Sequence, residues 1–115
     1  MSKTQTIYRV QNDNGEGPYI ADDKSPERRD MIDAHNESHP TPELDEDIGR
    51  GMTDSAEKCG FDSMLQLTDW FCQEELDMLE DDGFFIFEIH NAHITARSCH
   101  QVLYIPDKTW QYRNN

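Results

Sequence analysis

The sequence predicts an α+β domain, in which a small antiparallel or mixed β-sheet of about four strands carries two to three short helices on one face. Strand-like apolar runs lie near both ends of the chain, and helix signals lie between them. A chain of 115 residues corresponds to a single domain, residues 1–115, with one modest core. The expected elements are strands at 4–10, 17–20, 84–89 and 101–105 and helices at 27–34, about 63–71 and 73–82.

The first strand is predicted at residues 4–10, which are rich in β-branched and aromatic side chains. The Asn14-Gly15 dipeptide that follows is typical of a tight hairpin turn. Residues 17–20 are therefore expected to return as a short strand. Pro18 places that strand at the edge of the sheet, because proline has no amide hydrogen to donate.

A long acidic loop or insert is predicted at residues 21–57, which carry twelve acids, four bases and three prolines. One helix fits within it, at residues 27–34, with Ser25 as its cap and Pro26 at its first position. A loop of this length in a compact domain usually has a function or is mobile.

Two further helices are predicted in the middle of the chain. Ser63 and Gln66 fit a capping box that begins the first of them. The second is expected at residues 73–82, with Leu79 facing inward and Gly83 just beyond its end.

The C-terminal part contains the most hydrophobic run, residues 84–89, which is expected to form a central strand. Residues 91–92 are expected to form a turn or bend, and residues 93–98 fit either a strand or a loop. Residues 101–105 fit a final core strand, after which the tail is expected to fold back onto the sheet.

The charge balance limits the kind of partner. The chain has 24 acids against 10 bases and a formal net charge of −14. Direct binding to nucleic acid is disfavoured, because phosphates are bound by lysine and arginine. Anionic membranes are disfavoured for the same reason. The negative net charge favours a protein or protein complex with a basic surface as the partner. Electrostatic attraction would accelerate the association of that partner with the chain.

The expected location is the cytoplasm. The first ten residues are polar and lack the apolar run of a secretion signal, and no stretch approaches the length of a transmembrane helix. Three cysteines, without a secretion signal, suggest free thiols in a reducing compartment.

A metal site is not expected. The candidate ligands near the end of the chain are His90, His93, Cys99 and His100. Alternating residues of a strand point to opposite faces, so these four side chains are not expected to converge on a zinc ion. His35 and His39 have helical spacing, but the prolines that follow disfavour a helical metal pair. No cofactor-binding motif is present either.

Acidic residues on the helix predicted at 73–82 are the main candidates for partner binding. Glu74, Asp77 and Asp81 share one face at i, i+3 and i+7, and such carboxylates repeat about every 5–6 Å, similar to phosphates along one strand. The alternative is an ordinary solvated helix face. The residues expected to contact a partner are Glu74, Asp77, Glu80, Asp81 and the aromatic anchor Trp70, with Asp45, Glu46 and Asp47 second.

A sparse pattern extends over nearly the whole chain: Tyr8-Arg9-Val10, Gly17-Pro18-Tyr19, Cys59-Gly60-Phe61-Asp62-Ser63, Trp70-Phe71, Gly83-Phe84 and Gln101-Val102-Leu103-Tyr104. This pattern resembles a group of small phage and prophage proteins of unassigned function. The resemblance implies a bacterial host cell as the setting. By analogy of size, charge and origin, it also implies an anti-defence role, such as an anti-CRISPR inhibitor that mimics DNA.

Two other functions stay open at this point. The first strand and the later hairpin resemble ADP-ribosyltransferases, in which case Arg9 would bind NAD and Glu88 would be catalytic. The central Ser/Thr motif and the second acidic residue of those enzymes are absent. The other alternative is a passive phage accessory protein.

Overall fold

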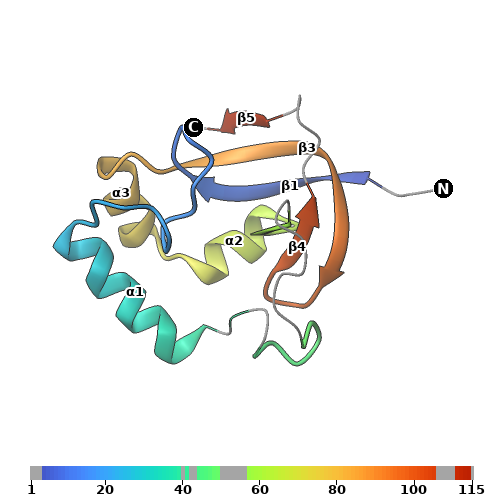
Figure 1. Cartoon of the computed structure of the whole chain (residues 1–115), viewed down its shortest axis with the longest axis horizontal. Helices are drawn as coiled ribbons and strands as arrows, with labels where there is room; N and C mark the ends of the chain where they lie inside the picture. The colour runs from blue at the N-terminus through green and yellow to red at the C-terminus, as the bar shows by residue number, and fades with distance from the viewer. Residues whose placement is uncertain (1–3, 40, 42–43, 50–56, 106–110, 115) are drawn as a thin grey trace.

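The computed structural model describes residues 4–39, 41, 44–49, 57–105 and 111–114. It is an α+β fold in which an antiparallel sheet is covered on one side by three helices (Figure 1). The elements are β1 (Thr4–Gln11), α1 (Pro26–Ser38), β2 (Lys58–Gly60), α2 (Met64–Trp70), α3 (Gln73–Asp81), β3 (Phe85–Arg97), β4 (Val102–Ile105) and β5 (Gln111–Asn114).

The sheet is built around the long strand β3. Its first half lies between β1 and β5, and its last residues pair with β4, which in turn pairs with β2. Phe61, directly after β2, exchanges two 2.8 Å backbone hydrogen bonds with Tyr8 of β1. The sheet therefore curls until its two ends meet. The pairing of β5 with β3 agrees with the expectation that the tail folds back onto the sheet.

Two apolar clusters hold the fold together. Val10 of β1 packs with Leu67, Phe71 and Leu79 from the helical layer. Ile7, three residues earlier on β1, packs in the other cluster with strand residues such as Ile89. Residues 7 and 10 differ by an odd number, so they lie on opposite faces of the strand and serve both clusters.

The helix ends predicted from the sequence are present. The Ser25 hydroxyl accepts a hydrogen bond from the Arg28 amide, and α1 extends one turn beyond the predicted end. The Ser63 hydroxyl accepts from the Gln66 amide at the start of α2, but the Gln66 side chain accepts from the Asp62 amide, so only this half of the predicted capping box is formed. Gly83 follows α3 with φ of +90°, a conformation that glycine adopts without strain.

Two local predictions were wrong, and one strand was not predicted. Residues 17–20 form a turn, in which Ala21 donates to the Gly17 carbonyl, and not a returning strand. Residues 91–92 do not reverse the chain, because Asn91 takes φ of +57° within β3 and the register with β1 shifts beside it. Residues 58–60, which no pattern indicated, form β2. The predicted loop that follows α1 falls largely on residues outside those described, namely 40, 42–43 and 50–56.

Candidate functional site

Helices α1 and α3 lie against each other and are tied at two points. Arg28 Nε lies 3.3 Å from Asp82 Oδ2, at the start of α1 and just after the end of α3. His35 Nε2 lies 2.7 Å from Glu75 Oε2, at the opposite ends of the two helices. The two ties are seven residues apart along each segment, from Arg28 to His35 and from Glu75 to Asp82. Helices α1 and α3 therefore run antiparallel, with about 10 Å between the ties.

The first tie depends on a buried cation. Arg28 is 1% exposed, and its Nη2 donates to the carbonyls of Ala21 (2.8 Å) and Asp22 (3.0 Å). Its guanidinium carbon lies 4.6 Å from the centre of the Phe84 ring. A buried charge is tolerated only with such partners, so Arg28 fixes the loop before α1 and the end of α3 together.

The second tie belongs to a chain of side-chain hydrogen bonds. Trp70 Nε1 donates to the Tyr19 hydroxyl at 2.8 Å, and that hydroxyl lies 2.5 Å from His35 Nδ1. Because Tyr19 accepts from Trp70, its own proton goes to His35 Nδ1, and the imidazole then carries its hydrogen on Nε2 and donates it to Glu75. His39 stacks on His35 with a centroid distance of 3.9 Å.

This arrangement is reflected in the pKa values of the tied groups. Burial lowers the pKa of His35 below its usual value, although Glu75 opposes this effect. Burial acts to raise the pKa of Glu75, but the Cys72 amide and His35 outweigh it, so the pKa of Glu75 is lowered. The neutral imidazole and the ionised carboxylate are therefore the forms that the fold prefers.

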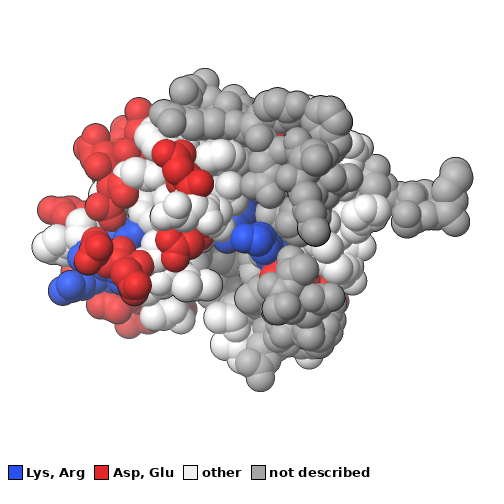
Figure 2. All heavy atoms as spheres, turned by 45° about the horizontal axis from the view of Figure 1, so that its top comes forward, with Lys and Arg blue, Asp and Glu red and all other residues white. Residues whose placement is uncertain are grey.

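The two tied helices carry a concentrated acidic surface. Figure 2 shows Asp and Glu side chains gathered at the end of the molecule where Figure 1 places α1 and α3. On α1, Asp30, Asp33 and Glu37 are exposed at i, i+3 and i+7, the spacing that Glu74, Asp77 and Asp81 have on α3. We define the acidic face as the exposed acids of this end: Asp22, Asp23, Glu27, Asp30, Asp33, Glu37, Asp69, Glu74, Asp77, Glu80 and Asp81.

A hollow of about 240 Å³ lies beside the acidic face. Its floor includes Leu76 of α3 and Ile86 of β3, and both Asp77 and Glu80 line it. An apolar floor next to two carboxylates suits a lysine or arginine side chain, because the stem packs on carbon while the head pairs with oxygen.

The second group of predicted contacts lies elsewhere. Asp45 is buried, where it accepts hydrogen bonds from Ser98 Oγ (2.6 Å) and Gln101 Nε2 (3.2 Å) near the turn between β3 and β4. Burial acts to raise the pKa of Asp45, but these hydrogen bonds lower it on balance. Its carboxylate therefore serves the fold and is not available to a partner, whereas Glu46 and Asp47 beside it are exposed.

Trp70 is half-buried and is not a free anchor. Its indole nitrogen is engaged by Tyr19, its backbone carbonyl lies 2.8 Å from His39 Nε2, and its ring packs against Phe61 at 5.7 Å. The ties that involve Arg28 and His35 leave no local signal in the sequence, because their partners are more than 35 residues away.

Arg9 and Glu88 do not form the pair considered for catalysis. On the paired strands Arg9 faces Phe87, while Glu88 faces Tyr8, so the two side chains leave opposite faces of the sheet. Glu88 lies 3.0 Å from His90 Nε2, and Arg9 donates to the Cys59 carbonyl. This geometry gives no support to the ADP-ribosyltransferase alternative.

Neither a metal-binding cluster nor a membrane-spanning helix is found in the described part of the chain. No group of three or more His, Cys, Asp or Glu side chains among them could hold a metal ion, and His90, His93, Cys99 and His100 form no such group. None of the described helices is both long and apolar enough to cross a bilayer.

Comparison with known proteins gives one match. Residues 1–114 match the model of a family described as bacteriophage T4 Y00F protein. Neither the curated proteins nor the solved structures contain a match to the chain.

Proposed function

The chain belongs to the bacteriophage T4 Y00F protein family, and on that basis we propose that it is an anti-defence inhibitor made during phage infection. In this proposal it binds a basic, nucleic-acid-binding surface of a host protein complex, of which a CRISPR surveillance complex is one example. The acidic face competes there with DNA. The observation that carries the proposal is the paired acidic rows on two tied helices.

The rows support a docking role because they are held in a fixed arrangement. Asp77 and Asp81 lie on α3, and Asp33 and Glu37 lie on α1, while the two ties prevent the helices from sliding past each other. Lysines and arginines that bind a phosphate backbone meet a comparable set of anionic oxygens on this surface. The negative field also steers a basic partner toward it.

The hollow beside Asp77 and Glu80 offers buried apolar contact, which exposed ion pairs lack. Each exposed pair contributes only about 0.2–1 kcal/mol, so a set of them gives weak binding. A long basic side chain inserted over Leu76 would add buried apolar contact to its ion pair. The proposal therefore centres on Glu74, Asp77, Glu80 and Asp81, with Glu46 and Asp47 as a separate second region.

The test is capture of host proteins from a bacterial lysate on the immobilised chain. Captured proteins are released with a short DNA duplex and identified by mass spectrometry. We expect the duplex to release a nucleic-acid-binding complex, and we expect capture to weaken as salt is raised. The Asp77→Asn/Asp81→Asn pair should weaken binding of the purified target about 2–30-fold, since two exposed pairs contribute about 0.2–1 kcal/mol each.

The matched control is the Asp13→Asn/Asp62→Asn pair, which removes the same two charges outside the acidic face. Equal losses in the two pairs would show that only the overall charge matters. A captured target that DNA does not displace would contradict the competition mechanism. Capture of phage structural proteins alone would favour the accessory role.

A further inference from the structure

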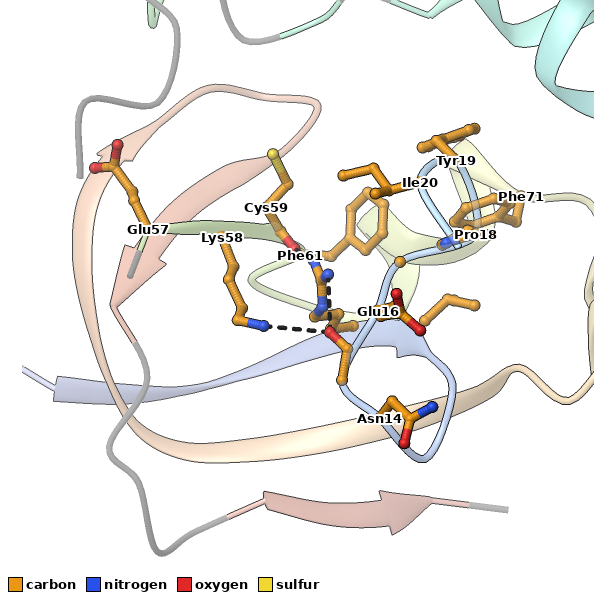
Figure 3. A pocket seen from close by; sticks show the side chains of 14 residues that line it. Asn14, Glu16, Pro18, Tyr19, Ile20, Glu57, Lys58, Cys59, Phe61 and Phe71 are labelled. Atoms are coloured by element: carbon orange, nitrogen blue, oxygen red, sulfur yellow. Dashed lines mark hydrogen bonds between the residues drawn. The ribbon is translucent and has the colours of Figure 1, made fainter. Parts of the chain in front are cut away.

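A second cavity, of about 470 Å³, is lined by residues of β1, of the turn after β1 and of β2. Figure 3 shows it bordered by the turn that follows β1 and by the strand β2. Its apolar wall includes Pro18, Tyr19, Ile20, Phe61 and Phe71. Apolar walls with a few convergent polar groups are typical of small-molecule sites.

Two cations, Arg9 and Lys58, line one side of this cavity. Arg9 donates from Nε to Gln11 Oε1 at 3.0 Å, from Nη1 to the Cys59 carbonyl at 2.6 Å and from Nη2 to the Gly15 carbonyl at 3.5 Å. Lys58 Nζ donates to the Gly15 carbonyl at 3.2 Å (Figure 3), and at least two hydrogens of its ammonium remain free to bind another group. These contacts are all to neutral oxygens, so both side chains keep their positive charge at the cavity wall.

Neither cation forms an ion pair with any carboxylate among the described residues, although the chain has 24 acids. Two carboxylates do line the cavity. Glu57 accepts a hydrogen bond from the Thr95 hydroxyl, and Figure 3 shows its carboxylate directed away from Lys58. Glu16 is exposed and accepts from Asn12 Nδ2 at 3.1 Å. The two cations on the cavity wall are therefore not paired with either of these carboxylates.

The electrostatic cost of this arrangement appears at Lys58. Burial, followed by repulsion from Arg9, lowers the pKa of the Lys58 ammonium. An anion placed beside Lys58 would remove the repulsion that this side of the cavity now carries.

We propose that this cavity binds a small organic anion with an apolar body. The anionic head, a carboxylate, sulfonate or phosphate, lies against Lys58 and Arg9, and the body packs on Tyr19, Phe61 and Phe71. This site has the opposite charge preference to the acidic face and does not depend on the inhibitor function.

The test compares two probes that share the same rings, 8-anilinonaphthalene-1-sulfonate and the uncharged N-phenyl-1-naphthylamine. Fluorescence titration is carried out on the full chain, on Lys58→Met and on the control Lys24→Met, which removes a half-buried lysine outside the cavity. We expect one sulfonate probe per chain, and we expect Lys58→Met to weaken its binding about tenfold or more. The neutral probe should change less than about threefold, and Lys24→Met should behave as the unchanged chain.

A second readout places the probe in the cavity. In a Cys72→Ser/Cys99→Ser variant, Cys59 is the remaining thiol, and it lines the cavity. The sulfonate probe should slow alkylation of Cys59 by iodoacetamide, and the Lys58→Met change should remove this protection. Urea unfolding midpoints confirm that each variant is folded.

The inference is overturned if the sulfonate probe does not bind below about 1 mM. It is equally overturned if Lys58→Met and Lys24→Met bind the probe alike, or if Cys59 is not protected. Equal weakening of the charged and uncharged probes by Lys58→Met would show an apolar cavity without an anion site, which also rejects the proposal.

Discussion

Replacing Arg28 by methionine is expected to destabilise the protein by about 1.5–5 kcal/mol. Methionine keeps most of the side-chain volume but removes the donors that satisfy the Ala21 and Asp22 carbonyls. Ala21 is 3% exposed, so its carbonyl would stay buried without a partner, at a cost of about 1–3 kcal/mol. Loss of the cation above Phe84 adds about 0.5–2 kcal/mol. The carboxylate of Asp82 is partly solvated and adds little.

The assay is urea unfolding followed by tryptophan fluorescence, with the free energy of unfolding extrapolated to water. Arg29→Met is the matched control, because Arg29 is the next residue on α1 but is exposed, and its loss should stay within about 0.5 kcal/mol. A difference below about 1 kcal/mol between the two variants would refute the assignment of Arg28 as a buried tie.

Two further outcomes follow from the described contacts. Because the pKa of His35 is lowered in the folded protein, the unfolded chain takes up a proton near pH 6.5 that the folded chain does not, so the free energy of unfolding should fall as pH drops below about 6.5. His35→Gln should abolish this decline in the free energy of unfolding. The pKa of Glu75 is also lowered, so its separate contribution to the decline should begin only below about pH 4.5. Urea titrations at a series of pH values measure both effects. Gly60→Ala should cost about 1–3 kcal/mol in the same assay, because its Cβ would lie 2.9 Å from Ile7 Cδ1 and 3.0 Å from the Tyr8 carbonyl. An unchanged unfolding midpoint for Gly60→Ala would contradict the close approach of β2 to β1.

Elements with local signals were predictable from the sequence. The caps at Ser25 and Ser63 and the positive φ at Gly83 depend on residues within one helical turn, and all three are present. The extent of β3 was not predictable, because its residues pair with β1, β4 and β5, which come from both ends of the chain. Asparagine is common in turns, and only the pairing with β1 shows that Asn91 lies in a β-bulge.

The predictions for the candidate site also separate into those with a local signal in the sequence and those without one. Exposure of Glu74, Asp77 and Asp81 followed from helical periodicity, since Leu79 takes the opposite, buried side of α3. The buried role of Asp45 did not, because its partners Ser98 and Gln101 are more than 50 residues away. The spacing of His35 and His39 did not indicate the role of His35, whose partners in the structure are Tyr19 and Glu75.

The matched ties between α1 and α3 have a consequence for how tightly the surface can bind. Sliding either helix along the other would break the contacts of Arg28 and His35 at the same time. No shifted position of the two helices keeps one of these contacts while losing the other. The carboxylates are thus presented from a preorganised template, and a partner does not have to spend binding free energy on ordering the backbone beneath them.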